Sequence, residues 1–401
     1  KCITVPCANP IRYLASCPAA LLTFTSAGLC QPDFQDAVVV GRGHAFFAGS
    51  ARQQHFLGVL ACASRGQFQH VAVEFDLDLF LADAGQLRHD QQLLALIKHV
   101  YDRLAGVGDN RMDGGAGTDT VSYADALAGV TVSLASETAQ ATGSSGTDTL
   151  ISIENLTGSN DDDRLTGSGL ANTLDGGGGA DTLIGGDGSD TYYVDNVGDR
   201  VIESNASVST GGNDTVCSYL AAYTLTDNVE NLRLLSAGAA DGTGNGLDNT
   251  LYAGAGDNRL DGGAGTDTVS YAYATAGVTV SLATQDAQST GGSASDTLIS
   301  IENLTGSRFN DTLTGNSLAN TLNGAGGSDT MAGGDGNDLY YVDHAGDQVT
   351  ESNADVATGG NDTVYSYLAA YTLTDNVENL RLLSAGAADG TGNDLDNTLY
   401  A

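Results

Sequence analysis

The chain has 401 residues, of which 15 are Lys or Arg and 50 are Asp or Glu, so its formal net charge at pH 7 is −35. A protein this acidic repels nucleic acid and anionic membrane surfaces, which leaves cations as its natural partners. No run of 18 apolar residues occurs, and a membrane-spanning helix is therefore not expected.

The first 104 residues differ from the rest, because they carry eight basic and eight acidic residues whereas residues 105–401 carry seven and 42. Residues 38–40 and 71–75 are predicted strands, and residues 86–104 have roughly helical spacing, so a small α+β segment is the most that we expect here. Five Cys and five His lie in this segment without C-x-x-C or H-E-x-x-H spacing. A zinc or redox site is therefore not favoured, and no catalytic motif can be assigned.

From residue 105 onward the chain is a duplication with a period of 148 residues. Residues 108–111 recur at 256–259, residues 151–156 at 299–304, and residues 229–232 at 377–380. We therefore predict two tandem modules, residues 105–253 and 254–401. The last three residues repeat residues 251–253, in the middle of a motif, which suggests that a longer protein continues beyond them.

Each module begins with a Gly-rich unit, residues 114–121 in the first copy. Residues 129–134 alternate between apolar and polar types, which predicts a longer strand, and a polar Ser/Thr/Gly loop is expected to follow it. Further strands are predicted near residues 214–216, 223–225 and 232–234.

The most regular stretch is a pair of nine-residue units, residues 176–184 and 185–193, that place Gly, Gly, Gly, Asp and a large apolar residue at the same five slots. Six residues of Gly and Asp can form a turn, and the remaining three can form a strand about 10 Å long. The apolar slot recurs in steps of nine, at Leu156, Leu165, Leu174, Leu183 and Tyr192, and in the second copy at Leu304, Leu313, Leu322, Met331 and Tyr340. A disordered acidic linker is the alternative, but a linker needs no such register.

One buried apolar residue in nine contributes about 1.5–3 kcal/mol, which does not offset about 1–2 kcal/mol of backbone entropy for each residue. Crowded carboxylates also repel one another. A bound cation reverses that repulsion, so metal binding would supply folding free energy. Carboxylate and carbonyl oxygens are the ligands that Ca²⁺ prefers.

These units resemble the RTX (repeat-in-toxin) calcium-binding nonapeptide, G-G-x-G-x-D-x-U-x, most closely at residues 176–193 and 324–341. The resemblance implies an all-β fold, a parallel β-roll in which alternate units stack and which folds on binding several Ca²⁺ ions. It also implies a protein that is exported by a type I system.

The expected side-chain ligands share the acidic slot of the repeat: Asp119, Asp163, Asp181, Asp190, Asp267, Asp311, Asp329 and Asp338. Asp187 and Asp335 at the third slot are expected to add oxygens, and backbone carbonyls are expected from Gly177, Gly179, Gly186, Gly188, Gly334 and Gly336. Asn172 and Asn320 replace Asp, so weaker or empty turns are expected there. Asp148, Asp214, Asp296 and Asp362 are less secure, because their neighbouring units break the register.

Other residues invite a functional interpretation but favour a structural one. Tyr192 and Tyr340 occupy the apolar slot and are predicted in the core rather than in a carbohydrate platform. Cys217 corresponds to Tyr365 in the second copy and His344 to Asn196, so a strand residue and a solvated loop residue are expected. Glu154 and Glu302 lie beside the repeat and are interpreted as exposed charge rather than as catalytic acids.

Two functions remain open. The first is a calcium-binding, structural or adhesive segment of a large secreted bacterial protein that acts at the cell surface or outside the cell, with surface or matrix ligands as partners. The second is the export-and-folding module of a type I-secreted protease or lipase. In either case no enzyme active site is expected in this chain.

Overall fold

The computed structural model describes residues 45–49, 52–56, 62–64, 67–69, 108–205, 207, 209–353 and 359–401. The chain forms two compact units, residues 1–96 and 97–401. The described part of the first unit consists of two antiparallel pairs, β1 (Ala45–Gly49) with β2 (Arg52–Phe56) and β3 (Cys62–Ser64) with β4 (Gln67–Gln69). The strands predicted at residues 38–40 and 71–75 and the helix predicted at 86–104 lie outside the described residues.

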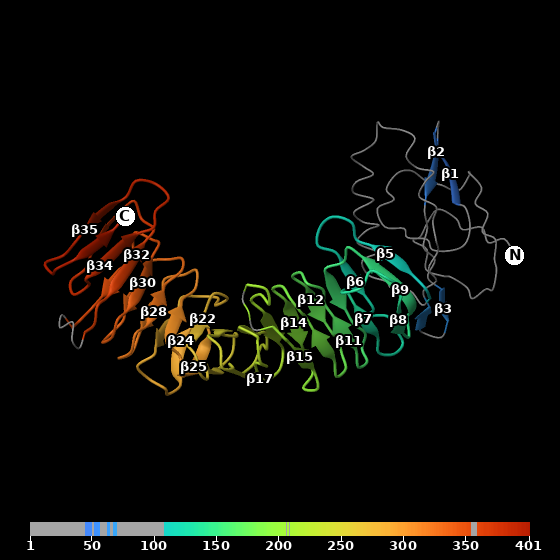
Figure 1. The fold of residues 1–401 in the computed structure, drawn as a ribbon, viewed down its shortest axis with the longest axis horizontal. Helices are drawn as coiled ribbons and strands as arrows, with labels where there is room; N and C mark the ends of the chain where they lie inside the picture. The colour runs from blue at the N-terminus through green and yellow to red at the C-terminus, as the bar shows by residue number, and fades with distance from the viewer. Residues whose placement is uncertain are drawn as a thin grey trace, which may run out of the picture. The chain divides into compact units, whose positions relative to one another are not determined.

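The second unit is a parallel β-roll, as the repeat predicts, and its main sheet has 14 strands (Figure 1). In chain order they are β6 (Thr120–Ser122), β10 (Asn155–Thr157), β12 (Thr173–Asp175), β14 (Thr191–Val194), β16 (Thr215–Ser218), β18 (Asn231–Leu234), β20 (Thr250–Tyr252), β22 (Thr268–Ser270), β26 (Asn303–Thr305), β28 (Thr321–Asn323), β30 (Leu339–Val342), β32 (Thr363–Ser366), β34 (Asn379–Leu382) and β36 (Thr398–Tyr400). Across the described ranges there is no helix of the length and apolarity that crossing a membrane requires.

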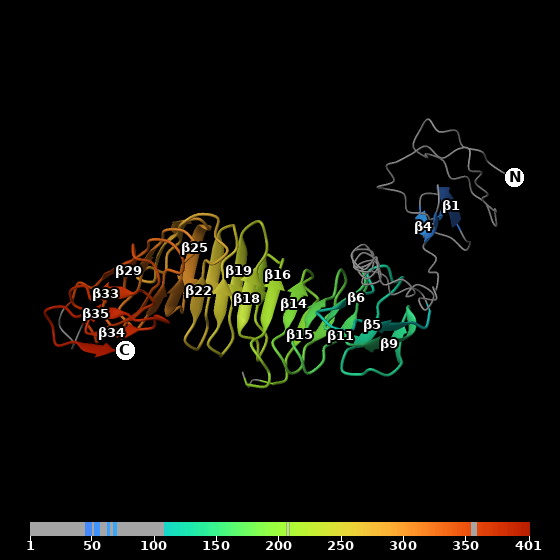
Figure 2. The same cartoon turned by 90° about the horizontal axis from the view of Figure 1, so that it is seen from above.

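Shorter sheets form the opposite wall of the roll (Figure 2). They contain β5 (Arg111–Asp113), β8 (Gln140–Gly143) and β9 (Gly146–Ile151); β7 (Thr131–Ser133), β11 (Arg164–Thr166), β13 (Thr182–Ile184) and β15 (Arg200–Ile202); β17 (Ala222–Thr224), β19 (Ala240–Thr243), β21 (Asn258–Asp261), β24 (Gln288–Gly291) and β25 (Ala294–Ile299); β23 (Thr279–Ser281), β27 (Thr312–Thr314), β29 (Thr330–Ala332) and β31 (Gln348–Thr350); and β33 (Ala370–Thr372) with β35 (Asp389–Thr391).

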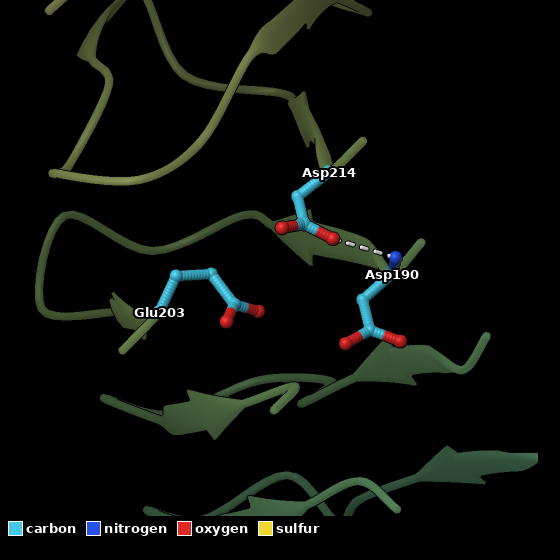
Figure 3. Close-up of side chains that lie close together, drawn as sticks. All are labelled: Asp190, Glu203 and Asp214. Carbon is cyan, nitrogen blue, oxygen red and sulfur yellow. Dashed lines mark hydrogen bonds between the residues drawn. The ribbon is translucent and has the colours of Figure 1, made fainter. Parts of the chain in front are cut away.

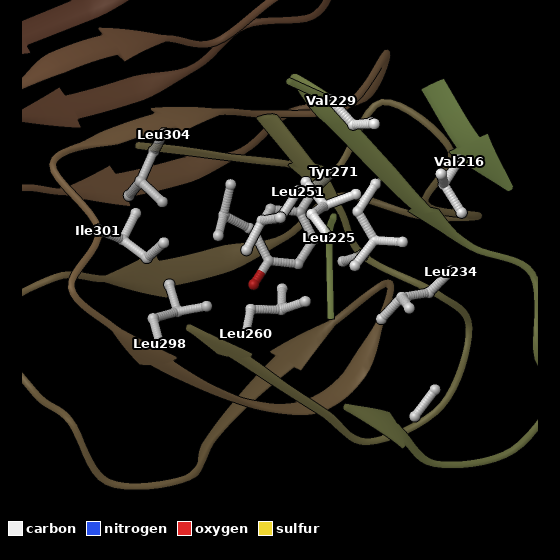
Figure 4. Packing of buried hydrophobic residues seen from close by; sticks show 14 of the residues in the cluster. Val216, Leu225, Val229, Leu234, Leu251, Leu260, Tyr271, Leu298, Ile301 and Leu304 are labelled. Atoms are coloured by element: carbon white, nitrogen blue, oxygen red, sulfur yellow. The ribbon is translucent and has the colours of Figure 1, made fainter. Parts of the chain in front are cut away.

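Successive nonapeptide units place their strands in opposite walls of the roll, so each unit stacks on the unit 18 residues away. Leu174 pairs with Leu156 and Tyr192 in the main sheet, while Leu183 pairs with Leu165 in the opposite wall. All ten residues predicted at the apolar slot are at most 1% exposed. Strands outside the strict repeat add buried side chains of their own, including Val216, Leu251 and Leu260 (Figure 4). The core is therefore fuller than one apolar residue in nine.

The two 148-residue copies form one continuous roll rather than two separate bodies. Strand β20 ends the first copy and pairs in parallel with β22 of the second, with Leu251 opposite Val269. The buried side chains in Figure 4 come from both sides of this junction and belong to one hydrophobic cluster. The duplication therefore extends the stack without interrupting its core.

Two predictions about the start of each module are wrong. Residues 129–134 contain a strand of only three residues, β7, and the polar segment after it forms an antiparallel hairpin, β8 with β9, rather than a loop. Polar side chains stabilise the hairpin: Thr142 Oγ1 donates to the Gly146 carbonyl at 3.1 Å within it, and Gln140 Oε1 accepts the Ser133 N–H at 2.7 Å, which joins the hairpin to β7. The alternation of apolar and polar residues cannot predict strand pairing that depends on side-chain hydrogen bonds.

Candidate metal centre

The residue that precedes each strand of the main sheet belongs to a continuous row of carboxylates and amides, which we call the main row. Each carboxylate after Asp119 accepts the backbone N–H of the row residue before it, for example Asp190 Oδ1 from Asn172 at 2.7 Å and Asp214 Oδ1 from Asp190 at 2.7 Å. The Asn members instead donate Nδ2 to a backbone carbonyl of the neighbouring turn. The row consists of Asp119, Glu154, Asn172, Asp190, Asp214, Glu230 and Asn249, followed by Asp267, Glu302, Asn320, Asp338, Asp362, Glu378 and Asn397.

A second, shorter row lies before the strands of the opposite wall and is built in the same way. Asp181 Oδ1 accepts the Asp163 N–H at 2.8 Å, and Asp199 Oδ1 accepts the Asp181 N–H at 3.0 Å. The second copy repeats this short row with Asp311, Asp329 and Asp347. The roll therefore carries negative charge along both edges, in steps of one stacked turn.

All eight Asp residues predicted as ligands lie in these rows and are at most 4% exposed. The structure places Asp119, Asp190, Asp267 and Asp338 in the main row and Asp163, Asp181, Asp311 and Asp329 in the short row. The four less secure residues, Asp148, Asp214, Asp296 and Asp362, are buried to the same degree, at most 1% exposed. The interrupted register of the sequence therefore does not interrupt the burial of these carboxylates.

The second oxygen of these side chains distinguishes two groups. No donor in the described part of the chain reaches Oδ2 of Asp181, Asp190, Asp267, Asp329 or Asp338, although these atoms are buried. By contrast, Asp163 Oδ2 accepts the Ser159 N–H at 2.5 Å, and Asp311 Oδ2 accepts the Ser307 N–H at 2.5 Å. The first group has an anionic oxygen available for an ion, whereas protein donors already occupy both oxygens in the second.

Burial raises the pKa of these carboxyl groups, because low polarity disfavours the charged form. The pKa of Asp181 rises to about 7, with a smaller contribution from the charges of Asp163 and Asp199, and that of Asp329 rises to about 6. An isolated buried carboxylate is costly, so each of these groups favours a proton or a cation over an empty site.

The six glycines predicted as carbonyl donors, Gly177, Gly179, Gly186, Gly188, Gly334 and Gly336, all have positive φ. They also stack closely on the neighbouring turn: a Cβ on Gly177 would collide with the Ser159 carbonyl, and one on Gly188 would collide with the carbonyl of Leu170. Carbonyl oxygens of one turn therefore face the backbone of the next. The turns thus supply carbonyl oxygens and the rows supply carboxylate oxygens, and both are ligand types that Ca²⁺ prefers.

Glycine at the first slot has a different role, because a Cβ there would occupy the place of the carboxylate. At Gly176 the added atom would collide with Asp181, and at Gly324 with Asp329. Neither glycine has a positive φ, so steric exclusion alone accounts for the small residue.

We expect Gly176→Ala to weaken calcium-dependent folding, since overpacking of a filled site costs about 1–3 kcal/mol. The measurement is the calcium concentration at the midpoint of folding, followed by circular dichroism. Gly169→Ala is the matched control, because no heavy atom lies within 4 Å of a Cβ at that turn position. Equal midpoints for the two variants would contradict the steric argument.

Asp187 and Asp335 are not brought to the rows. Both side chains are exposed on the outside of their turns, where Asp187 Oδ1 accepts a hydrogen bond from Asn205 at 2.8 Å and Asp335 Oδ1 accepts one from Asn353 at 2.9 Å. Their oxygens are therefore available to the outer rim of a turn and not to the buried side.

Glu154 and Glu302 are not exposed charges, which corrects the prediction from the sequence. Both are partly buried members of the main row, and each accepts a backbone N–H, from Asp119 at 2.7 Å and from Asp267 at 2.8 Å. Asn172 and Asn320 follow them in the row and use the amide that Asp lacks: Nδ2 donates at 2.7 Å to the carbonyl of Glu154 or Glu302. An amide at this step joins two turns without an ion.

The remaining structural interpretations are confirmed. Tyr192 and Tyr340 are 0% exposed, and Cys217 is a buried residue of β16. His344 lies on an exposed bend, where its ring is 3.1 Å from Ser328 Oγ.

The nonapeptide pattern did not predict two carboxylate triads in the interior, Asp190–Glu203–Asp214 and Asp338–Glu351–Asp362. In each triad one oxygen from every side chain lies within 4.8 Å of the others. Figure 3 shows the Glu203 carboxylate directed toward the two Asp side chains. The triads are 148 residues apart, so the recurrence of Glu203 as Glu351 was the available signal. Neither Glu lies in a nonapeptide unit, which is why the repeat pattern did not reveal them.

Comparison with known proteins agrees with this geometry. Residues 104–124, 155–196, 243–271 and 302–340 match the RTX calcium-binding nonapeptide repeat. No curated protein matches the chain. The buried Asp rows, the stacked glycine turns and the four matching stretches lead to one conclusion: the chain carries RTX calcium-binding nonapeptide repeats in four stretches between residues 104 and 340.

Proposed function

We propose that the β-roll of residues 105–401 folds on binding several Ca²⁺ ions and serves as a structural or adhesive segment of a large secreted bacterial protein. The observation that carries this proposal is the series of buried Asp oxygens without a donor in the described chain, which recurs in both copies. The proposed modules are residues 105–253 and 254–401.

The proposed ligands are the acidic-slot residues with an available oxygen, Asp181, Asp190, Asp267, Asp329 and Asp338, together with Asp119. Asp163 and Asp311 remain proposed members of the site that act mainly by fixing the turn, since both of their oxygens already accept hydrogen bonds. The glycine carbonyls of the stacked turns would complete each shell, and the exposed Asp187 and Asp335 would act at its rim. A bound calcium ion would supply the positive charge that these oxygens lack.

Coupling between binding and folding follows from where the charge lies. In the unfolded chain each carboxylate is hydrated and far from the others, whereas in the roll it is buried beside a neighbour one turn away. The ion therefore binds the folded state much more strongly than the unfolded state, and mass action converts that difference into stability.

The test replaces Asp181 and Asp329 together with Asn. We expect the calcium midpoint of folding to rise about 10- to 100-fold, because a contact to a charged group contributes about 1.5–3 kcal/mol and 1.4 kcal/mol is a factor of ten. Asn Oδ1 is an acceptor of the same size, as Asn172 Oδ1 is for the Ser168 N–H at 2.6 Å, so in the variant it can accept the N–H that Asp181 Oδ1 accepts from Asp163. The substitution thus removes charge while keeping the ladder.

The matched control is Asp227→Asn with Asp375→Asn, which removes the same charge from exposed positions 148 residues apart. Its calcium midpoint should stay within about twofold of that of the unchanged chain, since exposed charges contribute little. An unchanged midpoint in the Asp181 and Asp329 variant would place the ligands elsewhere.

Export by a type I system to the cell exterior or surface remains part of the proposal and is supported by the repeat family. The alternative is that this roll is the export-and-folding module of a secreted protease or lipase. Sequencing of the complete gene separates the two: further 148-residue copies favour the adhesive segment, whereas an adjoining catalytic domain favours the hydrolase.

A further inference from the structure

Each carboxylate triad lies at an enlarged turn of its module. Successive residues of the main row are 18 positions apart from Glu154 to Asp190 but 24 apart from Asp190 to Asp214. The stretches that match the nonapeptide repeat end at residues 196 and 340, so Glu203 and Asp214 in the first copy and Glu351 and Asp362 in the second lie outside them. The enlarged turn therefore needs a local explanation.

The register shows what has changed at this turn. Strand β13 pairs with β15 so that Ile184 lies opposite Ile202, and Glu203 therefore follows β15 as Gly185 follows β13. Gly185 has no room for a Cβ, because the added atom would collide with the Tyr192 hydroxyl and with Asp190. At the next turn the chain places a Glu in the slot that otherwise holds Gly. Its side chain is directed toward the two Asp residues (Figure 3).

The three side chains are almost completely buried and retain oxygens that protein donors do not satisfy. Asp190 and Asp214 are 1% exposed and Glu203 is 7% exposed. Within the described ranges, no donor reaches Asp190 Oδ2, Glu203 Oε2 or Asp214 Oδ2. Of the corresponding atoms in the second copy, Asp338 Oδ2 and Glu351 Oε2 are likewise without a donor.

The remaining contacts orient the triad instead of neutralising it. The Tyr192 hydroxyl donates to Glu203 Oε1, and the Asp190 N–H donates to Asp214 Oδ1 at 2.7 Å. No Lys or Arg pairs with the triad in the described chain, where the ion pairs are Arg111 with Asp113 and Arg259 with Asp261. Three buried carboxylates that point at one space without a cation are far more costly than the same three around an ion.

We infer that each triad is a calcium site of its own kind, in which Asp190, Glu203 and Asp214, or Asp338, Glu351 and Asp362, hold one ion through side-chain carboxylates where the enlarged turn departs from the nonapeptide. An all-carboxylate donor set selects a hard cation over zinc or copper, and it suits Ca²⁺ better than Mg²⁺, which retains several waters. The inference rests on the proposed function for the identity of the ion. It assigns Glu203 and Glu351 as calcium ligands, although neither residue belongs to the nonapeptide pattern.

The test counts ions in the full chain by native mass spectrometry and compares Glu203→Gln with Glu351→Gln against the exposed pair Asp227→Asn with Asp375→Asn. Gln keeps the size of the side chain and an acceptor for the tyrosine hydroxyl, but removes the charge. We expect the Glu variant to bind two ions fewer than the control. An ion count equal to that of the control would overturn the inference.

A second readout does not depend on the count and locates the ion. The chain contains no Trp, so Tb³⁺ bound in a triad is sensitised by the neighbouring Tyr192 or Tyr340. Tyr192→Phe with Tyr340→Phe should lower the tyrosine-sensitised emission while keeping the ion count of the unchanged chain. Emission equal to that of the unchanged chain would place the sensitised ion away from the triads.

The two proposals fail in different ways. Asp181 and Asp329 lie in the short row, outside the triads, so their Asn variant tests the nonapeptide sites alone. If that variant has no effect while the Glu variant loses two ions, the triads bind calcium and the nonapeptide assignment is wrong. If the Glu variant keeps its ions and its folded circular dichroism in calcium, the triad inference is wrong.

Discussion

Chelation of calcium from the full chain is expected to abolish most of its parallel-sheet signal in circular dichroism at pH 8. Corresponding residues of paired parallel strands lie about 4.8 Å apart, and two carboxylates at that distance repel by about 3 kcal/mol at an effective dielectric constant near 20. The main row of the first copy alone places Asp190, Asp214 and Glu230 in succession. Several such steps exceed the 5–15 kcal/mol by which a folded domain is usually stable.

The hydrophobic core does not alter this expectation, although it is continuous along the roll. Most of the three-residue strands bury one or two side chains, and a few bury none, while the turns between strands bury Asp and Glu. Restoring Ca²⁺ should restore the sheet signal with a sigmoidal dependence on concentration, whereas Mg²⁺ at the same concentration should not. A sheet signal that persists undiminished in chelator at pH 8 would show that the core suffices without metal.

Acidification of the calcium-free chain is expected to have the opposite effect and to restore folded structure. Burial raises the pKa of Asp190 to about 7 and that of Asp362 to about 7, above the ordinary value of 3.8. It also raises the pKa of Glu203 and of Glu351 to about 8, above 4.5. The metal-free roll therefore binds more protons than the unfolded chain throughout this range.

The sign of the effect follows from linkage. A carboxyl group with a raised pKa in the folded state favours folding below its unfolded pKa, and that stability is lost as the pH rises through the folded value. The metal-free roll should thus be most stable at about pH 4, and its stability should fall as the pH rises from about 4 to 8. Thermal unfolding in chelator across this range is the measurement. Greater stability at pH 8 than at pH 5 would contradict the assigned burial of these groups.

Calcium and protons compete for the same oxygens, so binding near neutral pH should release protons. Calorimetric titration in two buffers of different ionisation enthalpy measures that release. The Glu203→Gln with Glu351→Gln variant should release fewer protons than the unchanged chain, because its two highest acid pKa values are gone.

The sequence was sufficient to predict the parts of the roll that repeat strictly. The nine-residue register placed Leu183 and Tyr192 in the core and Asp181 and Asp190 in buried rows, because one apolar slot and one acidic slot fix the direction of every side chain between them. The positive φ of Gly177 and Gly188 followed from the same register. In these units the backbone conformation of the turn and the packing between stacked turns favour the same residue type at a given slot.

Where the nine-residue register breaks, the structure could not be predicted, because the contacts that determine it join residues of different turns rather than neighbours in the sequence. Glu203 joins Asp190 and Asp214 only because β15 stacks on β13, a relation that no nine-residue pattern contains. Glu154 resembled a surface charge because its partner, the backbone N–H of Asp119, is 35 residues away. The β8–β9 hairpin was missed because hydrogen bonds from Gln140 and Thr142 hold it, rather than apolar pairing.

We expect cations, and not the core alone, to hold the carboxylate rows of the roll together. The most direct test is electron density from crystals grown in calcium, with anomalous scattering measured to identify the ion. We expect an anomalous peak within coordination distance, about 2.3–2.6 Å, of Asp181 Oδ2 and of Asp329 Oδ2. Density that shows only water beside these two oxygens in calcium-saturated crystals would contradict it.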